Sequence, residues 1–275
     1  MAPGMRLQIF DVEHGACSLL TADNNTRLMI DCGHNATTGW KPGTYLVQQG
    51  IPDLDMLAIT NYDEDHASAS ADLFDKVRVA WLLRNASVSG ATIKMLKRED
   101  GIGPGINRLA HVIDYVFTGP GAPIVQEPLF QGVTRQVFYN NYPHFDDENN
   151  LSMVLFLKCN GTGVMFPGDL EKAGFQELLK LESFRQALLQ TNVYVASHHG
   201  RENGCCEETV AYLKNVYYVV ISDKGYQYET QETLPFYQRI AKGGPFRSEP
   251  NRRVLTTRCD GRIGFEFSPE SWGAY

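Results

Sequence analysis

Side chains that commonly bind metal ions are concentrated just after an apolar run, 54–59, which predicts a buried strand. They follow one another within a few residues: Asn61, Asp63, Asp65 and His66. Side chains at the end of a strand can converge on one point, which is the geometry that a metal site requires. Short motifs of this kind often arise by chance, so an acidic turn before a helix starting near Ala67 is an equally good interpretation.

Three other groups of potential ligands also adjoin predicted strands. They are Asn149 and Asn150 before the strand 151–158, Asp169 after the strand 163–166, and His198 and His199 after the strand 192–196. Binding sites in layered α/β proteins gather at strand ends. Four groups in this arrangement favour one shared site over coincidence.

The rest of the pattern predicts one α/β domain over residues 1–275, because no linker is long enough to divide the chain. Strands are expected over 6–12, 16–21, 27–31, 54–60, 77–83, 151–158, 163–166, 192–196, 217–222, 254–258 and 262–267. Helices are expected over 43–50, 67–75, 90–101, 170–189 (as one helix or two), 207–214 and 233–242. Residues 84–148 carry turn formers and are interpreted as an insertion, either a cap over the site or a surface for a protein partner.

The composition is that of an ordinary globular protein, with 43% hydrophobic and 21% charged residues. No apolar run approaches the ~18 residues of a membrane span, and the first residues do not resemble a secretory signal. Six scattered cysteines favour reduced thiols over disulfides. The net charge of -7 argues against indiscriminate nucleic-acid binding, although residues 235–275 carry a local net charge of +3. We therefore expect a cytoplasmic protein without a membrane segment.

Several short motifs occur in a fixed order along the chain. They are Asp-Val-x-x-Gly at 11–15, Ile-Asp-x-Gly at 30–33, x-x-Asp-x-Asp-His at 61–66, Asn-x-Ser-x-Val-Leu at 150–155, Gly-Asp-Leu-Glu at 168–171 and His-His-Gly at 198–200. With this order of motifs the chain resembles the metallo-β-lactamase superfamily, and within it the nuclease-like domain of the ComEC-type competence proteins. The resemblance implies an α/β fold of four layers, an αββα sandwich with mixed sheets.

The resemblance also implies two adjacent metal positions. The residues of one position are present: Asp65, His66, a bridging Asp169, and His198 or His199. Of the two histidines, the first is favoured as the ligand because it comes first after the strand. The other position usually contains histidines, and in their places this chain has Asn61, Asp63 and Asn150. Such oxygen ligands favour Mn²⁺ or Mg²⁺, although Zn²⁺ and the binding of one ion rather than two stay open.

The predicted activity is metal-dependent hydrolysis of a phosphodiester, with DNA as the favoured substrate. Asp65 would orient the hydroxide nucleophile, and Asp63 would complete the weaker metal position beside it. His199 and Lys224 are candidate contacts to a phosphate. Asp31 is expected to organise its loop as a hydrogen-bond acceptor rather than to bind the metal.

Two alternatives stay open. The acidic net charge favours a small-molecule phosphodiesterase, for instance one that hydrolyses a cyclic nucleotide. Asn61 is a weak ligand and favours a catalytically weak or inactive binding module. The presence of four converging polar groups, which are costly to bury, favours an active enzyme. The sequence does not choose a biological pathway or an oligomeric state.

Overall fold

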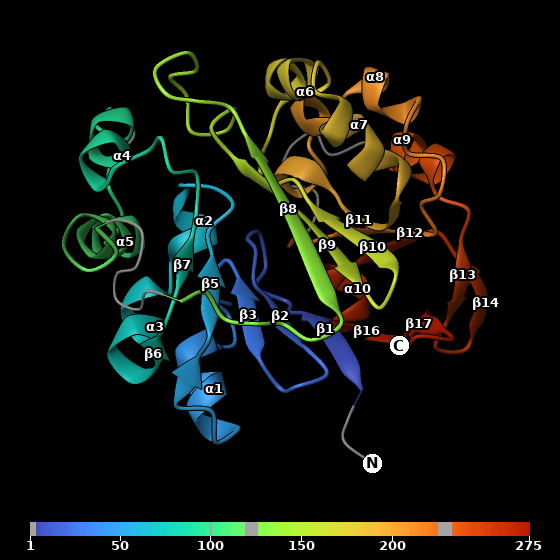
Figure 1. The fold of residues 1–275 in the computed structure, drawn as a ribbon, viewed down its shortest axis with the longest axis horizontal. Coiled ribbons are helices and arrows are strands. Elements are labelled where there is room, and N and C mark those ends of the chain that lie inside the picture. Colours follow the sequence, from blue (N-terminus) through green and yellow to red (C-terminus); the bar gives the residue numbers. More distant parts are fainter. Residues whose placement is uncertain (1–3, 100, 119–125, 225–232) are drawn as a thin grey trace.

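The computed structural model describes residues 4–99, 101–118, 126–224 and 233–275, and two β-sheets stack face to face at its centre (Figure 1). Within this described part, the first sheet has nine strands, in the order β14 (Glu249–Arg252), β13 (Gly244–Phe246), β17 (Trp272–Ala274), β16 (Ile263–Phe267), β1 (Met5–Ile9), β2 (Ser18–Thr21), β3 (Arg27–Ile30), β5 (Met56–Ala58) and β7 (Leu82–Leu83). The second sheet, described over the same residues, has six strands, in the order β15 (Val254–Thr256), β12 (Tyr218–Ile221), β11 (Thr191–Val195), β10 (Thr162–Phe166), β9 (Met153–Cys159) and β8 (Val133–Tyr139).

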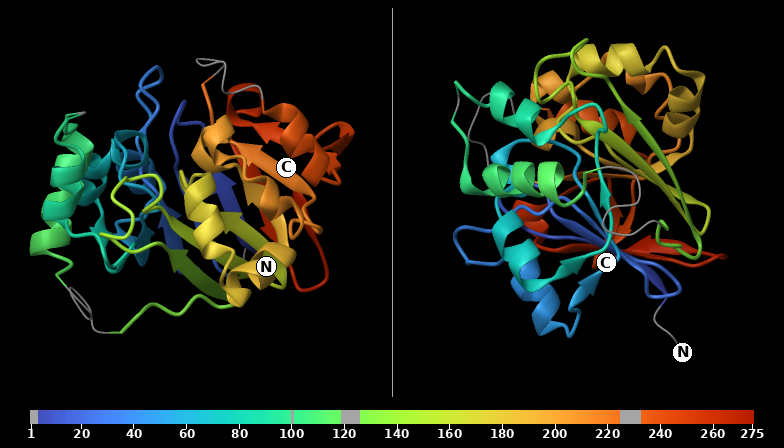
Figure 2. Two further views of the ribbon diagram at one scale, coloured as in Figure 1. Left: turned by 90° about the horizontal axis from the view of Figure 1, so that it is seen from above. Right: turned by 60° about the vertical axis from the view of Figure 1, so that its left-hand side comes forward.

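Helices cover the outer face of each sheet, so the fold has four layers (Figure 2). Beside the first sheet lie α1 (Pro42–Gln48), α3 (Ser70–Lys76), α4 (Gly90–Leu96) and α5 (Pro104–Tyr115). Beside the second sheet lie α6 (Lys172–Leu178), α7 (Glu182–Leu189), α8 (Glu207–Val210) and α9 (Leu234–Ile240). Both sheets are mixed. In the first sheet, β2 and β3 are antiparallel whereas β3 and β5 are parallel; in the second, β9 and β10 are antiparallel whereas β10 and β11 are parallel. The expected αββα sandwich is confirmed.

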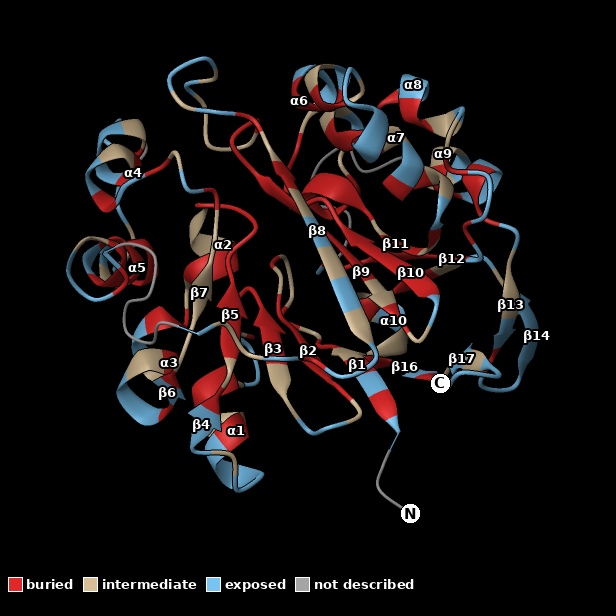
Figure 3. Ribbon diagram, viewed as in Figure 1, coloured by how far each residue is buried: buried red, intermediate tan, exposed pale blue. Residues whose placement is uncertain are grey.

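Apolar side chains fill the space between the layers, and the strands that face it are buried along most of their length (Figure 3). The alternation of side chains along β9 shows how one strand serves two interfaces. Met153, Leu155 and Leu157 point into the cluster between the two sheets. Val154 and Phe156 point the other way, into the cluster under α6 and α7. A strand buried on both faces reads as the continuous apolar run seen in the sequence.

Residues 84–148, expected as an insertion, include β8, α4 and α5, which belong to the sandwich. Strand β8 pairs with β9 along its whole length, and α4 and α5 contribute side chains to the core beside the first sheet. Helix α5 begins among the turn formers, with Pro104 in its first turn. The Glu64 carboxylate accepts hydrogen bonds from the N–H groups of Gly105 (2.8 Å) and Ile106 (3.0 Å) and so caps this helix.

Some predicted elements are divided or shorter than expected. The strand expected over 77–83 is two strands, because β6 (Arg78–Val79) pairs with β4 (Asp53–Leu54) whereas β7 pairs with β5. The helical region 170–189 is two helices, α6 and α7, and only 207–210 of the helix expected over 207–214 is helical. Among the residues that the structure describes, no helix is long and apolar enough to cross a membrane.

Candidate metal centre

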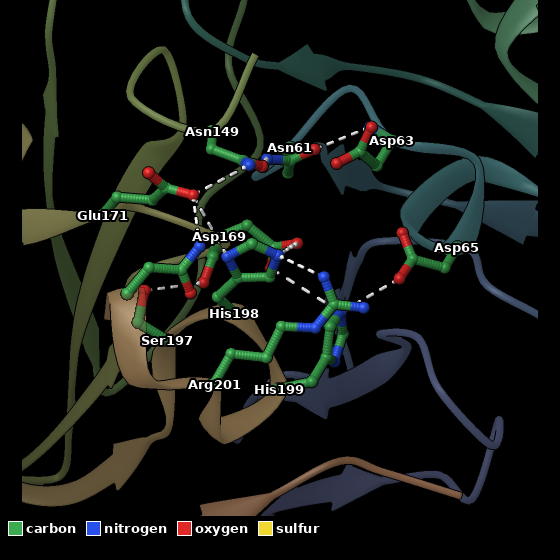
Figure 4. Close-up of polar contacts among 12 residues, drawn as sticks. Asn61, Asp63, Asp65, Asn149, Asp169, Glu171, Ser197, His198, His199 and Arg201 are labelled. Carbon is green, nitrogen blue, oxygen red and sulfur yellow. Dashed lines mark hydrogen bonds and ion pairs between the residues drawn. The ribbon is translucent and has the colours of Figure 1, made fainter. Parts of the chain in front are cut away.

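Asp65, His66, Asp169 and His199 form a compact cluster where β5, β10 and β11 end (Figure 4). Each residue offers one ligand atom, and these four atoms all lie within 4.8 Å of one another. His66 Nε2 lies 2.9 Å from Asp169 Oδ1 and 3.2 Å from His199 Nε2. Asp65 Oδ2 lies 3.2 Å from the same nitrogen of His199. Tertiary structure thus brings together three predicted ligands from two distant motifs and adds one of the two adjacent histidines.

Asp31 fixes the orientation of His66. It lies at the end of β3, where its Oδ1 accepts a hydrogen bond of 2.8 Å from the backbone N–H of Thr60. Its Oδ2 lies 3.0 Å from His66 Nδ1. The Nδ1–H of His66 therefore donates to the carboxylate, which leaves the lone pair of Nε2 facing the cluster. The expectation that Asp31 organises the loop without joining the cluster agrees with these contacts.

Two glycines of the sequence motifs allow the ligand loop to pack closely against the first sheet. A Cβ atom on Gly15 would lie 2.6 Å from the backbone oxygen of Asp65, and one on Gly33 would lie 2.4 Å from it. Real Cβ atoms do not approach an oxygen so closely, so neither position accepts a side chain without movement of the backbone. The carbonyl of Asp65 also accepts a hydrogen bond of 3.3 Å from Ala16 N–H. These contacts fix the backbone from which Asp65 projects.

The turn after β11 determines which of the two adjacent histidines joins the cluster. His198 (φ 50°), His199 (φ 52°) and Gly200 (φ 80°) are consecutive residues with left-handed backbone conformations. Such a conformation is costly for non-glycine residues and is often found at functional sites. It turns His199 inward, where its Nδ1 donates to the carbonyl of Ser222 at 3.0 Å and its Nε2 faces Asp65.

The structure places His199, and not the favoured His198, in the cluster. The Nε2 of His198 lies 3.9 Å from Asp169 Oδ2, and its Nδ1 lies 3.5 Å from Glu171 Oε1. His199 takes the place in the cluster because two successive left-handed residues reverse the direction in which the side chains leave the strand. The order of residues along the chain could not reveal this reversal.

The electrostatics of the cluster fit a bound cation. Both histidines of the cluster direct the Nε2 atom of the ring inward, next to two carboxylates, so positive charge between them is favourable. Burial alone would lower the pKa of His66, but Asp169 and Asp31 raise it well above its ordinary value. Burial would raise the pKa of Asp169, but His66 and His199 hold it well below its usual range. Asp65 Oδ1 is buried without a hydrogen-bond partner among the described residues. Two imidazole nitrogens and two carboxylates are a donor set suited to a divalent metal ion.

The residues expected at the other metal position make different contacts. Asn61 is fully buried, donates from Nδ2 to Ser152 Oγ at 3.0 Å, and accepts from Asp63 N–H at 2.6 Å. The Asp63 carboxylate forms an ion pair with the ammonium group of Lys97. Asn150 Oδ1 accepts a hydrogen bond of 2.8 Å from the N–H of Gly174, which lies in the first turn of α6. In this structure, one side-chain oxygen of each of these three residues already contacts another group of the protein.

A cationic side chain that sequence reasoning missed lies beside the cluster. Arg201 donates to His198 Nε2 at 3.2 Å (Figure 4) and to His14 Nε2 at 3.1 Å. Its place directly after the His-His-Gly motif is the signal that could have revealed it. Lys224, predicted as a phosphate contact, instead forms an ion pair of 3.1 Å with Glu13.

The sequence is similar to that of one curated protein. No protein-family model matches the chain. In sequence the chain is similar to ComE operon protein 3 of Bacillus subtilis (strain 168), with 25% identity over 229 residues. The match covers 81% of this chain and 26% of that protein, so the chain spans about a quarter of the length of the curated relative it matches.

Three solved structures give alignments of low identity. One is described as a putative metal-dependent hydrolase from Parabacteroides distasonis (13% identity, TM-score 0.47, 93% of this chain and 94% of that one). Another is described as a diphosphatase from the PhnP family (9% identity, TM-score 0.44, 95% of this chain and 98% of that one). The third is an archaeal metallo-β-lactamase superfamily protein from Sulfolobus tokodaii (14% identity, TM-score 0.43, 70% of this chain and 79% of that one). The protein thus has a four-layer αββα fold, and its sequence is similar to that of ComE operon protein 3.

Proposed function

We propose that this protein is a metal-dependent hydrolase that cleaves phosphodiester bonds, with DNA as its favoured substrate. The observation that carries the proposal is the cluster of Asp65, His66, Asp169 and His199, in which two oriented imidazoles and two carboxylates face one point. We infer that Mn²⁺ or Mg²⁺ is the preferred ion, with Zn²⁺ as the alternative. When bound, the ion would supply Lewis-acid polarisation of a phosphate oxygen and lower the pKa of a water molecule.

The protein's own residues would bind and orient the reactants. The Asp65 carboxylate has one oxygen directed to His199 and a second, buried oxygen without a partner among the described residues, so that second oxygen is placed to orient the attacking water. The guanidinium of Arg201 can turn its forked N–H donors from the two histidines to two oxygens of a phosphate. Neutral imidazoles are weaker acceptors than a phosphate, so this exchange of partners is favourable.

A second candidate function is the hydrolysis of a small phosphodiester such as a cyclic nucleotide. The net charge of -7 favours it, because a long polyanion is usually bound by an extended basic surface. The carboxylate of Glu171 lies beside His198 and would repel neighbouring phosphates of a DNA strand. A single phosphate held by Arg201 would avoid that repulsion.

The test combines metal content with cleavage of defined substrates. The purified protein is loaded with Mn²⁺, Mg²⁺ or Zn²⁺ and incubated with plasmid DNA or with cyclic nucleotides, beside His199→Ala and His111→Ala variants. His111 is an exposed residue of α5 outside the cluster, so its loss should leave both metal content and activity unchanged. We expect DNA cleavage that requires the added ion and falls at least ~100-fold in His199→Ala, the range seen when catalytic groups are removed.

Other outcomes decide against the proposal or redirect it. Cleavage of cyclic nucleotides with intact DNA would establish the second candidate instead. Metal-dependent cleavage that persists in His199→Ala would refute the assignment of the cluster as the active site. Failure to bind any of the three ions at millimolar concentration would exclude a hydrolase of this kind. A His198→Ala variant should retain its ion, because that ring lies outside the cluster.

A further inference from the structure

A lysine is buried at the place where the superfamily resemblance implies the first metal ion. Lys97 follows α4, and its side chain is about nine-tenths buried. Its ammonium group contacts the carboxylates of both Asp63 and Glu148. Buried lysines are rare unless they are paired, and this one is paired twice. Burial alone would lower the pKa of Lys97, but these two carboxylates raise it, so the group is charged at neutral pH.

The other residues of this position are tied to the same ion pair by hydrogen bonds. Asn61 accepts from Asp63 N–H, and its amide donates to the oxygen of Asn149 at 3.3 Å and to the backbone oxygen of Glu148 at 3.4 Å. In Figure 4, Asn149, Asn61 and Asp63 lie in a row above Asp169 and Asp65. The group is therefore built around an ammonium cation and two amides, and no imidazole of the described residues joins it.

The charges of this group explain why a metal ion and the lysine exclude one another. Asp63 and Glu148 bring two negative charges, and Lys97 neutralises one of them while it contacts both oxygens. A divalent ion on the same carboxylates would lie beside a buried ammonium group, and like charges repel strongly where water is scarce. The Asp63 carboxylate is thus already paired with a cation, the ammonium group of Lys97.

We propose that Lys97 takes the place of the first metal ion, so that each chain binds one divalent ion, at the cluster of Asp65, His66, Asp169 and His199. In this arrangement the ammonium group supplies the second positive charge beside the centre. The role of the lysine is to position Asp63 and Glu148 and to keep a second ion out. The proposal rests on the metal centre put forward above, but it does not depend on the identity of the substrate.

The test is a count of bound ions, which needs no activity. Equilibrium dialysis against Mn²⁺ with detection by mass spectrometry is carried out on the wild type, Lys97→Met and Lys97→Arg. We expect one ion per chain in the wild type and in Lys97→Arg, which keeps the charge. Lys97→Met leaves Asp63 and Glu148 without their cation and should bind two ions, with magnetic coupling between the two Mn²⁺ ions in the electron paramagnetic resonance spectrum.

A double variant separates the proposed cause from a general disturbance. Asp63→Asn combined with Lys97→Met removes both charges of the pair and should return the count to one. If Lys97→Met does not fold, Lys97→Gln keeps a polar group between the carboxylates and should show the same gain of one ion. Two ions in the wild type, or an unchanged count in the folded neutral variants, would overturn the role of Lys97.

The two proposals fail in distinguishable ways. The absolute count in the wild type tests the metal centre, because a value of zero removes the cluster as a site. The difference between a neutral Lys97 variant and the wild type tests the lysine, because it reports only the ion that the ammonium group excludes.

Discussion

Replacing Asp31 by asparagine should weaken metal binding, although Asp31 does not belong to the cluster. In the wild type, Oδ1 accepts from Thr60 N–H and Oδ2 faces His66 Nδ1. In Asp31→Asn the amide oxygen keeps the backbone hydrogen bond, so the NH₂ group takes the place of Oδ2. Two donors would then face each other unless His66 loses its Nδ1 proton. The ring would respond by carrying its proton on Nε2, which is the nitrogen needed for the metal.

The magnitude follows from the contact that is lost. Substitution of the residue that orients a histidine ligand typically lowers metal affinity by ~10–100-fold. For Asp31→Asn we expect the upper end, a hundredfold loss of affinity or about 2.7 kcal/mol of metal-binding free energy. The substitution favours the His66 tautomer with its proton on Nε2, and it also removes a negative charge. Folding without metal should change less, since the amide oxygen retains the hydrogen bond from Thr60 N–H and the volume of the side chain is unchanged. The hydrogen bond that Thr60 Oγ1 donates to Oδ2 is lost in the variant.

The assay is a titration with Mn²⁺ in competition with a chelator, alongside thermal unfolding with and without the ion. Stabilisation by an ion grows with the logarithm of its concentration over Kd, so a hundredfold weaker Kd should remove about 2.7 kcal/mol of the metal-dependent stability. Asp53→Asn is the matched control, because Asp53 is an exposed carboxylate paired only with Arg78 among the contacts described. An affinity of Asp31→Asn within twofold of the wild type would refute the orienting role.

Two further predictions concern the framework of the centre. Gly33→Ala would place a Cβ atom 2.4 Å from the backbone oxygen of Asp65, so it should lower the free energy of unfolding by ~1–3 kcal/mol in urea denaturation; Gly273→Ala, which meets nothing within 4 Å, is the control, and equal effects of the two would contradict the packing argument. Glu64→Gln should cost ~1 kcal/mol of stability because it weakens the cap on two N–H groups of α5; an unchanged urea midpoint would show that this cap contributes nothing.

Much of the fold could be predicted because its signals are local. The strands β9, β10 and β12 contain apolar runs, and each is buried along nearly its whole length. Strand β8 was missed because it lies at the edge of its sheet, where only Phe138 of its side chains is fully buried. Helix α5 was missed because its first residues are turn formers and its cap, Glu64, comes from a segment 41 residues earlier.

The sequence by itself determined the donor types of the centre, because Asp65, His66 and Asp169 follow strands whose ends meet in a layered sandwich. Asp31 could be recognised as an acceptor for a similar local reason. Tertiary structure alone decided which of two adjacent histidines joins them, because this depends on left-handed backbone angles that residue order does not encode. It also decided the pairing of Lys97 with Asp63, because these residues are far apart in the sequence and only the folded chain brings the lysine at the end of α4 next to the carboxylate.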